Sequence, residues 1–84
     1  MRYKEAYTDE FLKRVKKLKK KDKKLLDRLN KKIDEILDNP EHYKSLKYRH
    51  KGKRRAHVGS FVIVFEIKGN TVIFHSFKHH DFAY

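Results

Sequence analysis

The sequence predicts one α+β domain, in which a short N-terminal strand and a helical hairpin precede a three-stranded antiparallel meander. Three observations lead to this prediction. Apolar residues recur at helical spacing in the first half of the chain, strand-like alternation with Gly-containing turns fills the second half, and Asn39-Pro40 separates the two. Because 84 residues suffice for one core and not for two, we expect residues 1–84 to form a single domain.

The first half is predicted to form an edge strand followed by two helices. Residues 2–7 interleave Tyr with charged side chains, and Thr8 then supplies an N-cap that is followed by acidic residues in the first helical turn. Asp22 is a second N-cap, and Asn39-Pro40 ends the second helix. The apolar positions with helical spacing are Phe11, Leu12, Val15 and Leu18 in the first helix, and Leu25, Leu26, Leu29, Ile33, Ile36 and Leu37 in the second.

The second half is predicted to form strands at 53–58, 61–67 and 71–77, with turns at Gly59-Ser60 and 68–70. The order is therefore β-α-α-β-β-β, with the helical pair packed on one face of the sheet. The central strand has no polar residue between Phe61 and Phe65, so both of its faces require cover. Since the helices cover only one face, we expect the other to be a concave, partly apolar and partly basic binding surface.

The charge balance points to a polyanionic partner. The chain has 23 Lys and Arg against 11 Asp and Glu, a formal net charge of +12. Such an excess favours nucleic acid or an acidic protein as the partner. The absence of Cys excludes disulfides, thiolate nucleophiles and Cys-ligated zinc. The longest apolar run is five residues, far below the roughly 20 that span a bilayer, so we expect a cytoplasmic protein without a membrane segment.

The strand 53–58 holds the first candidate site. Alternation places Lys53, Arg55 and His57 on one face, while Ala56 and Val58 lie on the other and belong to the core. Two cations would then flank an imidazole that titrates near neutral pH. The alternative interpretation is an ordinary solvated strand face.

The C-terminal residues hold the second candidate site. If residues 78–84 turn helically, the spacing of four places His80 and Tyr84 on one side. The alternative is that these histidines are surface residues without a function. Six His residues occur without an HExxH or similar spacing, and His79 and His80 are expected to point apart, so the sequence predicts no metal site and no cofactor.

These residue types suit RNA cleavage without a metal. A base must take the proton from the RNA 2′-OH, an acid must protonate the leaving 5′ oxygen, and fixed cations must stabilise the transition-state charge. Histidine can fill either proton-transfer role, and Arg55 can donate a fork of hydrogen bonds to phosphate oxygens. DNA lacks the 2′-OH and would not react.

The stretch 52–59, GKRRAHVG, followed by FVIVFEI at 61–67 and by His80 four places before Tyr84, resembles the RelE/ParE toxin superfamily. The resemblance covers essentially the whole chain and is strongest to the RelE and YafQ branch. It implies a type II toxin that cuts messenger RNA on the ribosome without a metal and is held inactive by a cognate acidic antitoxin. Ribosome and mRNA are thus the implied partners, and the free oligomeric state is left open.

The resemblance also implies site residues. His57 is similar to the YafQ histidine in an A-H-V segment, and His80 to the histidine before the final aromatic, which is Tyr84 here. Lys53 and Arg55 fall where RelE has a pair of strand lysines. We therefore expect Arg55, His57, His80 and Tyr84 to be catalytic, with either histidine as the base. The expected RNA contacts are Lys44, Lys47, Lys53, Arg54, Lys78 and His79.

The sequence departs from these relatives at three places, one of which is that a further YafQ histidine before the second strand is replaced near Lys44. Val62 stands where RelE has an arginine, and the neutral turn Gly59-Ser60 stands where YafQ has an acidic residue. A weak or inactive relative that only binds RNA or antitoxin is therefore one alternative, and a gyrase inhibitor of the ParE type is another. The Lys-rich run 13–24 is assigned to ribosomal RNA phosphates, its alternative being a solvated helix face.

Overall fold

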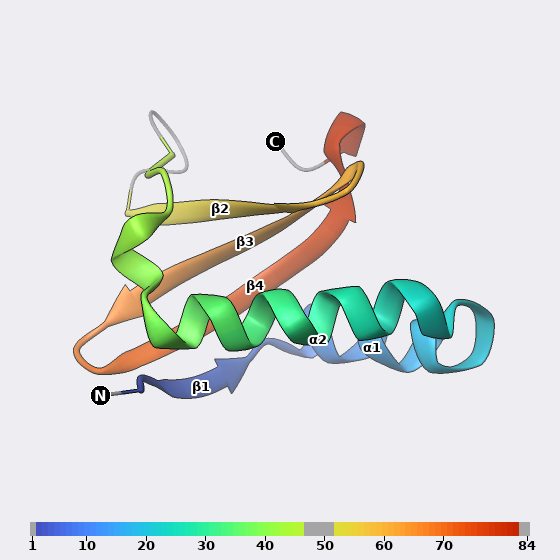
Figure 1. The fold of residues 1–84 in the computed structure, drawn as a ribbon, viewed down its shortest axis with the longest axis horizontal. Helices are drawn as coiled ribbons and strands as arrows, with labels where there is room; N and C mark the ends of the chain where they lie inside the picture. Colours follow the sequence, from blue (N-terminus) through green and yellow to red (C-terminus); the bar gives the residue numbers. More distant parts are fainter. Residues whose placement is uncertain (1, 47–51, 83–84) are drawn as a thin grey trace.

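In the computed structural model, which describes residues 2–46 and 52–82, two helices lie against one face of a sheet (Figure 1). The predicted order β-α-α-β-β-β is confirmed. The elements are β1 (Lys4–Tyr7), α1 (Asp9–Lys21), α2 (Lys23–Asp38), the 3-10 turn η1 (Pro40–His42), β2 (Lys53–Val58), β3 (Phe61–Lys68), β4 (Thr71–His79) and the 3-10 turn η3 (His80–Phe82).

The sheet has four strands in the order β1-β4-β3-β2. β2, β3 and β4 form the predicted antiparallel meander, and β1 pairs in parallel with β4 at the edge. β4 extends two residues beyond the predicted strand because the pairing continues to Phe61 opposite His79. Ser45 forms an isolated antiparallel bridge to Arg54, so the segment before β2 lies along the other edge of the sheet.

The two helices begin where the sequence predicts. The Thr8 side chain accepts a hydrogen bond from the Phe11 backbone N–H at 3.2 Å, and Asp22 accepts one from Leu25 at 3.1 Å. Both bonds satisfy N–H groups that a helix leaves without an internal partner. Within residues 2–46 and 52–82, no helix is long and apolar enough to cross a membrane.

The core lies between the helices and one face of the sheet, which we call the helix face. Its fully buried side chains come from all layers and include Phe11, Leu29, Ile36, Leu37, Ile63, Phe65, Phe74 and Phe77. Tyr7 stacks on Phe74 with ring centroids 5.2 Å apart, which closes the core at β1. The helical periodicity and the strand alternation therefore identified the core side, except that Leu12, expected on the apolar stripe of the first helix, is 50% exposed.

A bulge interrupts the pairing of β3 with β4. Val64 lies opposite Ser76, but the next residue, Phe65, lies opposite Phe74, so His75 is the extra residue on β4. A bulge changes the face to which a side chain points and increases the local twist. Here it places two adjacent polar residues, His75 and Ser76, beside one pocket.

Candidate functional site

The face of the sheet that points away from the helices, here the open face, carries basic residues around a narrow apolar strip. Arg55 lies opposite Val64 and His57 lies opposite Val62. Ala56 and Val58, the alternate residues of β2, are 2% and 4% exposed in the core. The predicted alternation along β2 is therefore confirmed. Val62 and Val64 are also buried, although they are not part of the core on the helix face.

The segment before β2 widens this face. The Arg55 N–H donates to the Lys44 carbonyl at 3.1 Å, and the Leu46 N–H donates to the Lys53 carbonyl at 2.7 Å. Lys44 is thereby placed beside Arg55, as a cross-strand neighbour on the same face. Lys44, Ser45, Leu46 and Arg55 line a pocket of about 380 Å³.

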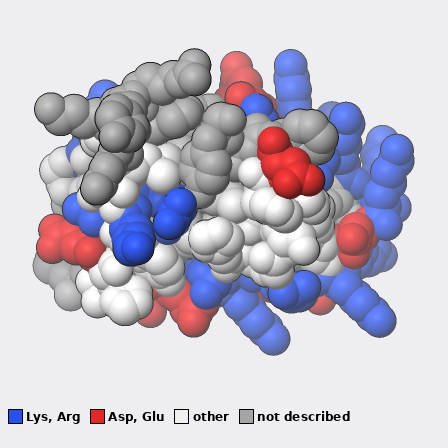
Figure 2. Space-filling view, turned by 90° about the horizontal axis from the view of Figure 1, so that it is seen from above, with Lys and Arg blue, Asp and Glu red and all other residues white. Residues whose placement is uncertain are grey.

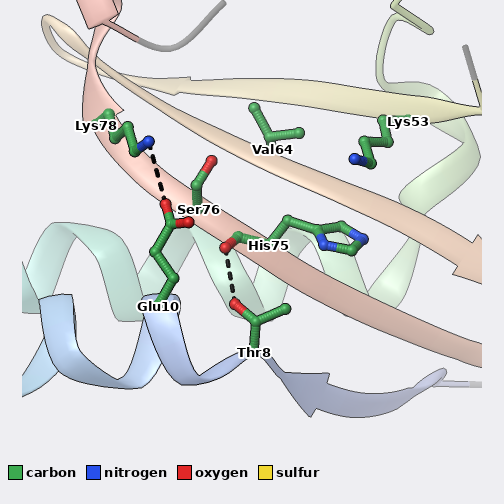
Figure 3. A pocket seen from close by; sticks show the side chains of 7 residues that line it. All are labelled: Thr8, Glu10, Lys53, Val64, His75, Ser76 and Lys78. Atoms are coloured by element: carbon green, nitrogen blue, oxygen red, sulfur yellow. Dashed lines mark hydrogen bonds and ion pairs between the residues drawn. The ribbon is translucent and has the colours of Figure 1, made fainter. Parts of the chain in front are cut away.

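A second pocket, of about 250 Å³, lies between the open face and the start of α1 (Figure 3). Lys78 reaches across it and forms an ion pair with Glu10 at 3.2 Å. The Thr8 hydroxyl donates to the His75 carbonyl at 2.8 Å, so one residue both caps α1 and holds the bulge. The other lining residues are Lys53, Val64 and Ser76. Two lysines and two hydroxyls around a cavity suit a phosphate or sugar group.

His75 and Glu66 form a polar pair on this side that the sequence analysis missed. The His75 Nε2 lies 2.7 Å from Glu66 Oε1, and each side chain is about a quarter exposed or less. The signal in the sequence is the adjacent polar pair His75-Ser76 between Phe74 and Phe77, because two consecutive polar residues break the alternation of a strand and are typical of a bulge.

His80 lies at the end of the sheet where β2 turns into β3. Its backbone N–H donates to the Ser60 carbonyl at 2.9 Å, and its ring Nδ1 lies 3.1 Å from the same oxygen. A carbonyl oxygen can only accept, so Nδ1 carries a proton in this contact. The other ring nitrogen, Nε2, lies 3.0 Å from Asp81 Oδ1.

The turn that receives His80 depends on a close approach by α2. Gly59 has a φ of +59°, and a side chain at this position would lie 3.0 Å from the Arg28 guanidinium. Glycine adopts this left-handed conformation without strain, whereas other residues do so rarely. A substitution at Gly59 is therefore expected to strain the turn whose Ser60 carbonyl contacts His80.

The structure brings His80 to the same end of the sheet as His57. His57 and Lys78 both flank Val62, from β2 and β4 respectively. Their backbones are separated by two strand spacings, roughly 9–10 Å, and His80 follows two residues after Lys78. η3 rises from the end of β4 beside the β2–β3 turn, on the side away from the helices (Figure 1). Arg55 and His57 share the open face, and His80 lies at the β2–β3 end of the sheet, with its ring beside that of His79.

Two predicted RNA contacts lie on the helix face instead. Arg54 donates from its guanidinium to the Tyr43 carbonyl at 2.8 Å and thus holds the segment before β2. His79 lies opposite Phe61, and its ring meets the Phe61 ring edge-on at 5.6 Å. Both point away from Arg55, so neither belongs to the site on the open face. Of the other predicted residues, Lys47 and Tyr84 lie outside the described residues.

The prediction that His79 and His80 point apart is wrong. Their ring centroids are 4.5 Å apart. Strand alternation ends at His79, where β4 ends, and η3 begins at His80, so the rule that separates adjacent side chains on a strand does not apply across this junction. Asp81 contacts both rings.

A second basic surface covers α1. Lys13, Lys16, Lys17 and Lys20 line a shallow pocket of about 250 Å³. Figure 2 shows that Lys and Arg side chains gather at the end of the molecule where α1 meets α2. This surface is separate from the open face. Sequence reasoning identified its lysines from the helical periodicity alone.

Among the described residues, the shifted pKa values belong to groups outside this site, namely Arg2, whose pKa is raised chiefly by its hydrogen bond to Asp34, and three tyrosines. Burial, with a smaller contribution from the Glu5 carboxylate, raises the pKa of Tyr7 to about 12. Burial also raises the pKa of Tyr3 and of Tyr43. In each case the low-polarity surroundings disfavour the charged phenolate.

Comparisons with known proteins agree on a family. The model of the ParE toxin of the parDE type II toxin–antitoxin system matches residues 6–84. A protein of Methanocaldococcus jannaschii named "Putative toxin RelE4" is 47% identical over 73 residues, which are 83% of this chain and 78% of that protein. An uncharacterised protein of Methanosarcina mazei is 42% identical over 71 residues, covering 81% of this chain and 83% of that one.

Solved structures share the fold at low sequence identity. The RelBE2 toxin–antitoxin complex of Mycobacterium tuberculosis matches with a TM-score of 0.82 and 18% identity, covering 95% of this chain and 100% of that chain. The DinJ-YafQ complex of E. coli matches with a TM-score of 0.78 and 19% identity, over 100% and 99% of the two chains. The YoeB dimer of Staphylococcus aureus matches with a TM-score of 0.81 and 19% identity, over 95% and 99%.

Proposed function

Because the chain belongs to the RelE/ParE superfamily of toxins from type II toxin–antitoxin systems, we propose that it is an endoribonuclease that cleaves translated mRNA on the ribosome. The observation that supports the proposal is that Arg55 and His57 share the open face, while His80 is held at the β2–β3 turn, the end of the sheet nearest His57. A guanidinium and two imidazoles around one linkage suffice for RNA cleavage by proton transfer and charge stabilisation.

The proposed reaction uses the substrate's own 2′-OH as the nucleophile. A histidine takes the 2′-OH proton, the 2′ oxygen bonds to phosphorus, and the bond from phosphorus to the 5′ oxygen breaks. The second histidine gives a proton to the departing 5′ oxygen, which leaves a 2′,3′-cyclic phosphate on the upstream fragment. Arg55 stabilises the extra negative charge on the phosphate oxygens. The side chains supply each role, so the proposal requires no metal.

The contacts of His80 favour it as the acid. Its Nδ1 faces the Ser60 carbonyl and its Nε2 faces the Asp81 carboxylate. A ring protonated at both nitrogens satisfies both acceptors, whereas a neutral ring satisfies only one. His57, whose side chain is exposed, is then the base. We keep Tyr84 in the proposal as the residue that stacks on or orients a nucleotide.

The proposed RNA contacts are the lysines of the open face and its border. Lys53 and Lys78 line the pocket beside Ser76, and Lys44 lines the pocket beside Arg55. Lys47 is proposed as a further RNA contact on the basis of its sequence position. Arg54 and His79 are left out, because both contact the helix face. The lysines of α1 supply contacts to ribosomal RNA phosphates, which carry affinity without sequence information.

An acidic antitoxin is the proposed partner that holds the toxin inactive. Related folds are known from complexes, such as RelBE2 and DinJ-YafQ. The net charge of +12 and the basic side chains of the open face suit an acidic segment that orders as it binds. Such a segment would neutralise Arg55 and the flanking lysines and exclude RNA from the same surface.

Cleavage of ribosome-bound mRNA by variants of the two histidines tests the proposal. Purified His57→Ala and His80→Ala proteins are expected to cleave at least about 100-fold more slowly than wild type, the usual contribution of a general acid or base. His42→Ala is the matched control, because His42 is exposed and contacts Tyr43 outside the site. Wild-type rates in both site variants would refute the assignment.

A gyrase inhibitor is the second candidate, because the matching family model is described as the ParE toxin. Inhibition of gyrase needs a binding surface and no proton transfer. A supercoiling assay run beside the translation assay separates the two functions. Supercoiling that is blocked equally by wild type and by His80→Ala, without mRNA cleavage, would establish the second candidate.

A further inference from the structure

The C-terminal turn η3 gathers two imidazoles and a carboxylate at one point. Asp81 Oδ2 lies 3.5 Å from His79 Nδ1, and Asp81 Oδ1 lies 3.0 Å from His80 Nε2. One ligand atom from each of the three residues lies within 4.8 Å of the others. The three side chains are between about a third and two thirds exposed, so an ion can reach them from solvent.

These separations suit a small transition-metal ion. Zn²⁺ bonds to His nitrogen and carboxylate oxygen at about 2.0–2.2 Å, so two ligand atoms of a tetrahedral site lie about 3.3 Å apart. The two contacts to Asp81, at 3.0 and 3.5 Å, bracket this value. These two contacts are to different Asp81 oxygens, and one ligand atom of each residue lies within 4.8 Å of the others, so side-chain rotations are needed to direct the three ligand atoms to one ion.

The hydrogen bonds around the two rings select the nitrogens that face Asp81. His79 Nδ1 accepts from the Asp81 N–H at 3.3 Å, so it is the unprotonated nitrogen of its ring, and its lone pair must leave this hydrogen bond to bind an ion. His80 Nδ1 carries the proton in its contact with the Ser60 carbonyl, so Nε2 becomes the ligand atom when an ion displaces its proton. Histidines that bind metals usually donate their other ring N–H to a carbonyl or carboxylate in this way, which fixes the ring and its tautomer.

We infer that His79, His80 and Asp81 form a binding site for Zn²⁺ or a similar divalent transition metal, and that the bound ion inhibits RNA cleavage. Two imidazoles favour zinc over magnesium or calcium, which prefer oxygen ligands. Inhibition follows because the ion takes His80 Nε2, the atom that donates the proton in the proposed function. The metal site itself is independent of that function, whereas the inhibitory effect rests on it.

Binding is tested with the full-length chain carrying no affinity tag, because added histidines would bind the same ions. Co²⁺ serves as the visible probe, and Zn²⁺ is then added to displace it. We expect one equivalent of Co²⁺ to bind, with the intense visible absorption of a four-coordinate site. His79→Ala and His80→Ala are expected to weaken binding at least about tenfold, whereas His42→Ala is expected to leave it unchanged.

Two results would overturn the metal site. One is an absence of Co²⁺ binding to the wild-type chain. The other is binding of equal strength in wild type, His79→Ala and His80→Ala, which would place the ion elsewhere. Far-UV circular dichroism of each variant establishes that a loss of binding does not come from loss of the fold.

Inhibition is tested with His79→Ala, because His79 lies outside the proposed cleavage machinery. Without Zn²⁺ this variant is expected to cleave ribosome-bound mRNA at the wild-type rate. With Zn²⁺ at a concentration that saturates the wild-type site, wild type is expected to lose activity and His79→Ala to keep it. Equal inhibition of both proteins would overturn the inhibitory link. Saturated wild type that cleaves at full rate would leave the metal site standing and refute the role of His80 as the acid.

Discussion

The two faces of the same strands differ in what occupies them. On the helix face, Phe65, Phe74 and Phe77 are closed into a core by α1 and α2. On the open face, Arg55, His57 and Lys78 flank two valines, and Arg55 and Lys78 each line a pocket. Successive residues of β2 alternate between these environments. Adjacent residues of β2 therefore belong either to the core or to the proposed site. Substitutions at neighbouring positions are expected to change either stability or RNA cleavage.

The largest expected effect is on the helix face. Phe74→Ala is expected to lower the free energy of unfolding by about 3–5 kcal/mol, because it leaves a cavity between Tyr7, Phe11 and Phe65. Lys78→Ala, on the open face, is expected to cost at most about 1 kcal/mol, since its ion pair with Glu10 is half exposed. Urea denaturation measures both. Since Phe74→Ala endangers folding, Ile63→Val, with an expected loss of about 1 kcal/mol, provides a milder test of the same face.

Adjacent arginines on β2 give the sharpest contrast. Arg55→Ala is expected to reduce mRNA cleavage about 100-fold or more, the scale of losing one group that stabilises transition-state charge. Arg54→Ala is expected to keep the cleavage rate of the folded protein and to lose about 1–2 kcal/mol of stability with its hydrogen bonds to the Tyr43 and Glu41 carbonyls. The mRNA cleavage rates and the urea denaturation curves of the two variants measure these effects. Slow cleavage by Arg54→Ala, together with a wild-type cleavage rate and lower stability of Arg55→Ala, would contradict this assignment.

Thr8 connects the two faces, because it caps α1 and holds the His75 carbonyl at the pocket. Thr8→Ala is expected to lower the free energy of unfolding by about 1 kcal/mol, the usual value of an N-cap. Thr8→Ser keeps both hydrogen bonds and is the control. Thermal denaturation distinguishes them. Equal losses in both variants would mean that the methyl group, and not the hydroxyl, stabilises this junction.

The smallest expected effect concerns Tyr7 at the edge of the core. Its pKa in the fold is raised to about 12, so the neutral phenol is favoured in the folded state. The associated stability is present below the unfolded pKa of about 10 and is lost as the pH rises through about 12. Tyr7→Phe cannot ionise, and its unfolding free energy is expected to fall less between these pH values. If the free energy of unfolding fell equally with pH in wild type and Tyr7→Phe, the raised pKa of Tyr7 would be contradicted.

Much of this contrast could be predicted from the sequence. Alternation along 53–58 assigned Arg55 and His57 to one face and Ala56 and Val58 to the other, because the side-chain period of a strand is two. The helices and their caps at Thr8 and Asp22 were predictable because capping is local. The family resemblance identified the fold that the comparisons support.

Other features depend on long-range geometry and could not be predicted. The bulge at His75 breaks the period of β4, so the pocket and the Glu66–His75 pair were missed. The positive charge of Arg54 led to the prediction that it contacts RNA. Its hydrogen bond to a backbone carbonyl depends on how the segment before β2 folds back, which the sequence does not show. The approach of His79 to His80 arises where a strand changes into a 3-10 turn, a boundary that alternation does not describe.

In the proposed function, groups of the open face and η3 cut RNA through its own 2′-OH. The most direct measurement uses ribosomes loaded with a synthetic mRNA that has a single 2′-deoxynucleotide immediately upstream of the mapped cut. We predict that wild-type protein cuts the unmodified mRNA, leaves a 2′,3′-cyclic phosphate, and does not cut the modified linkage. Cleavage of both mRNAs at the same rate would contradict this proposal.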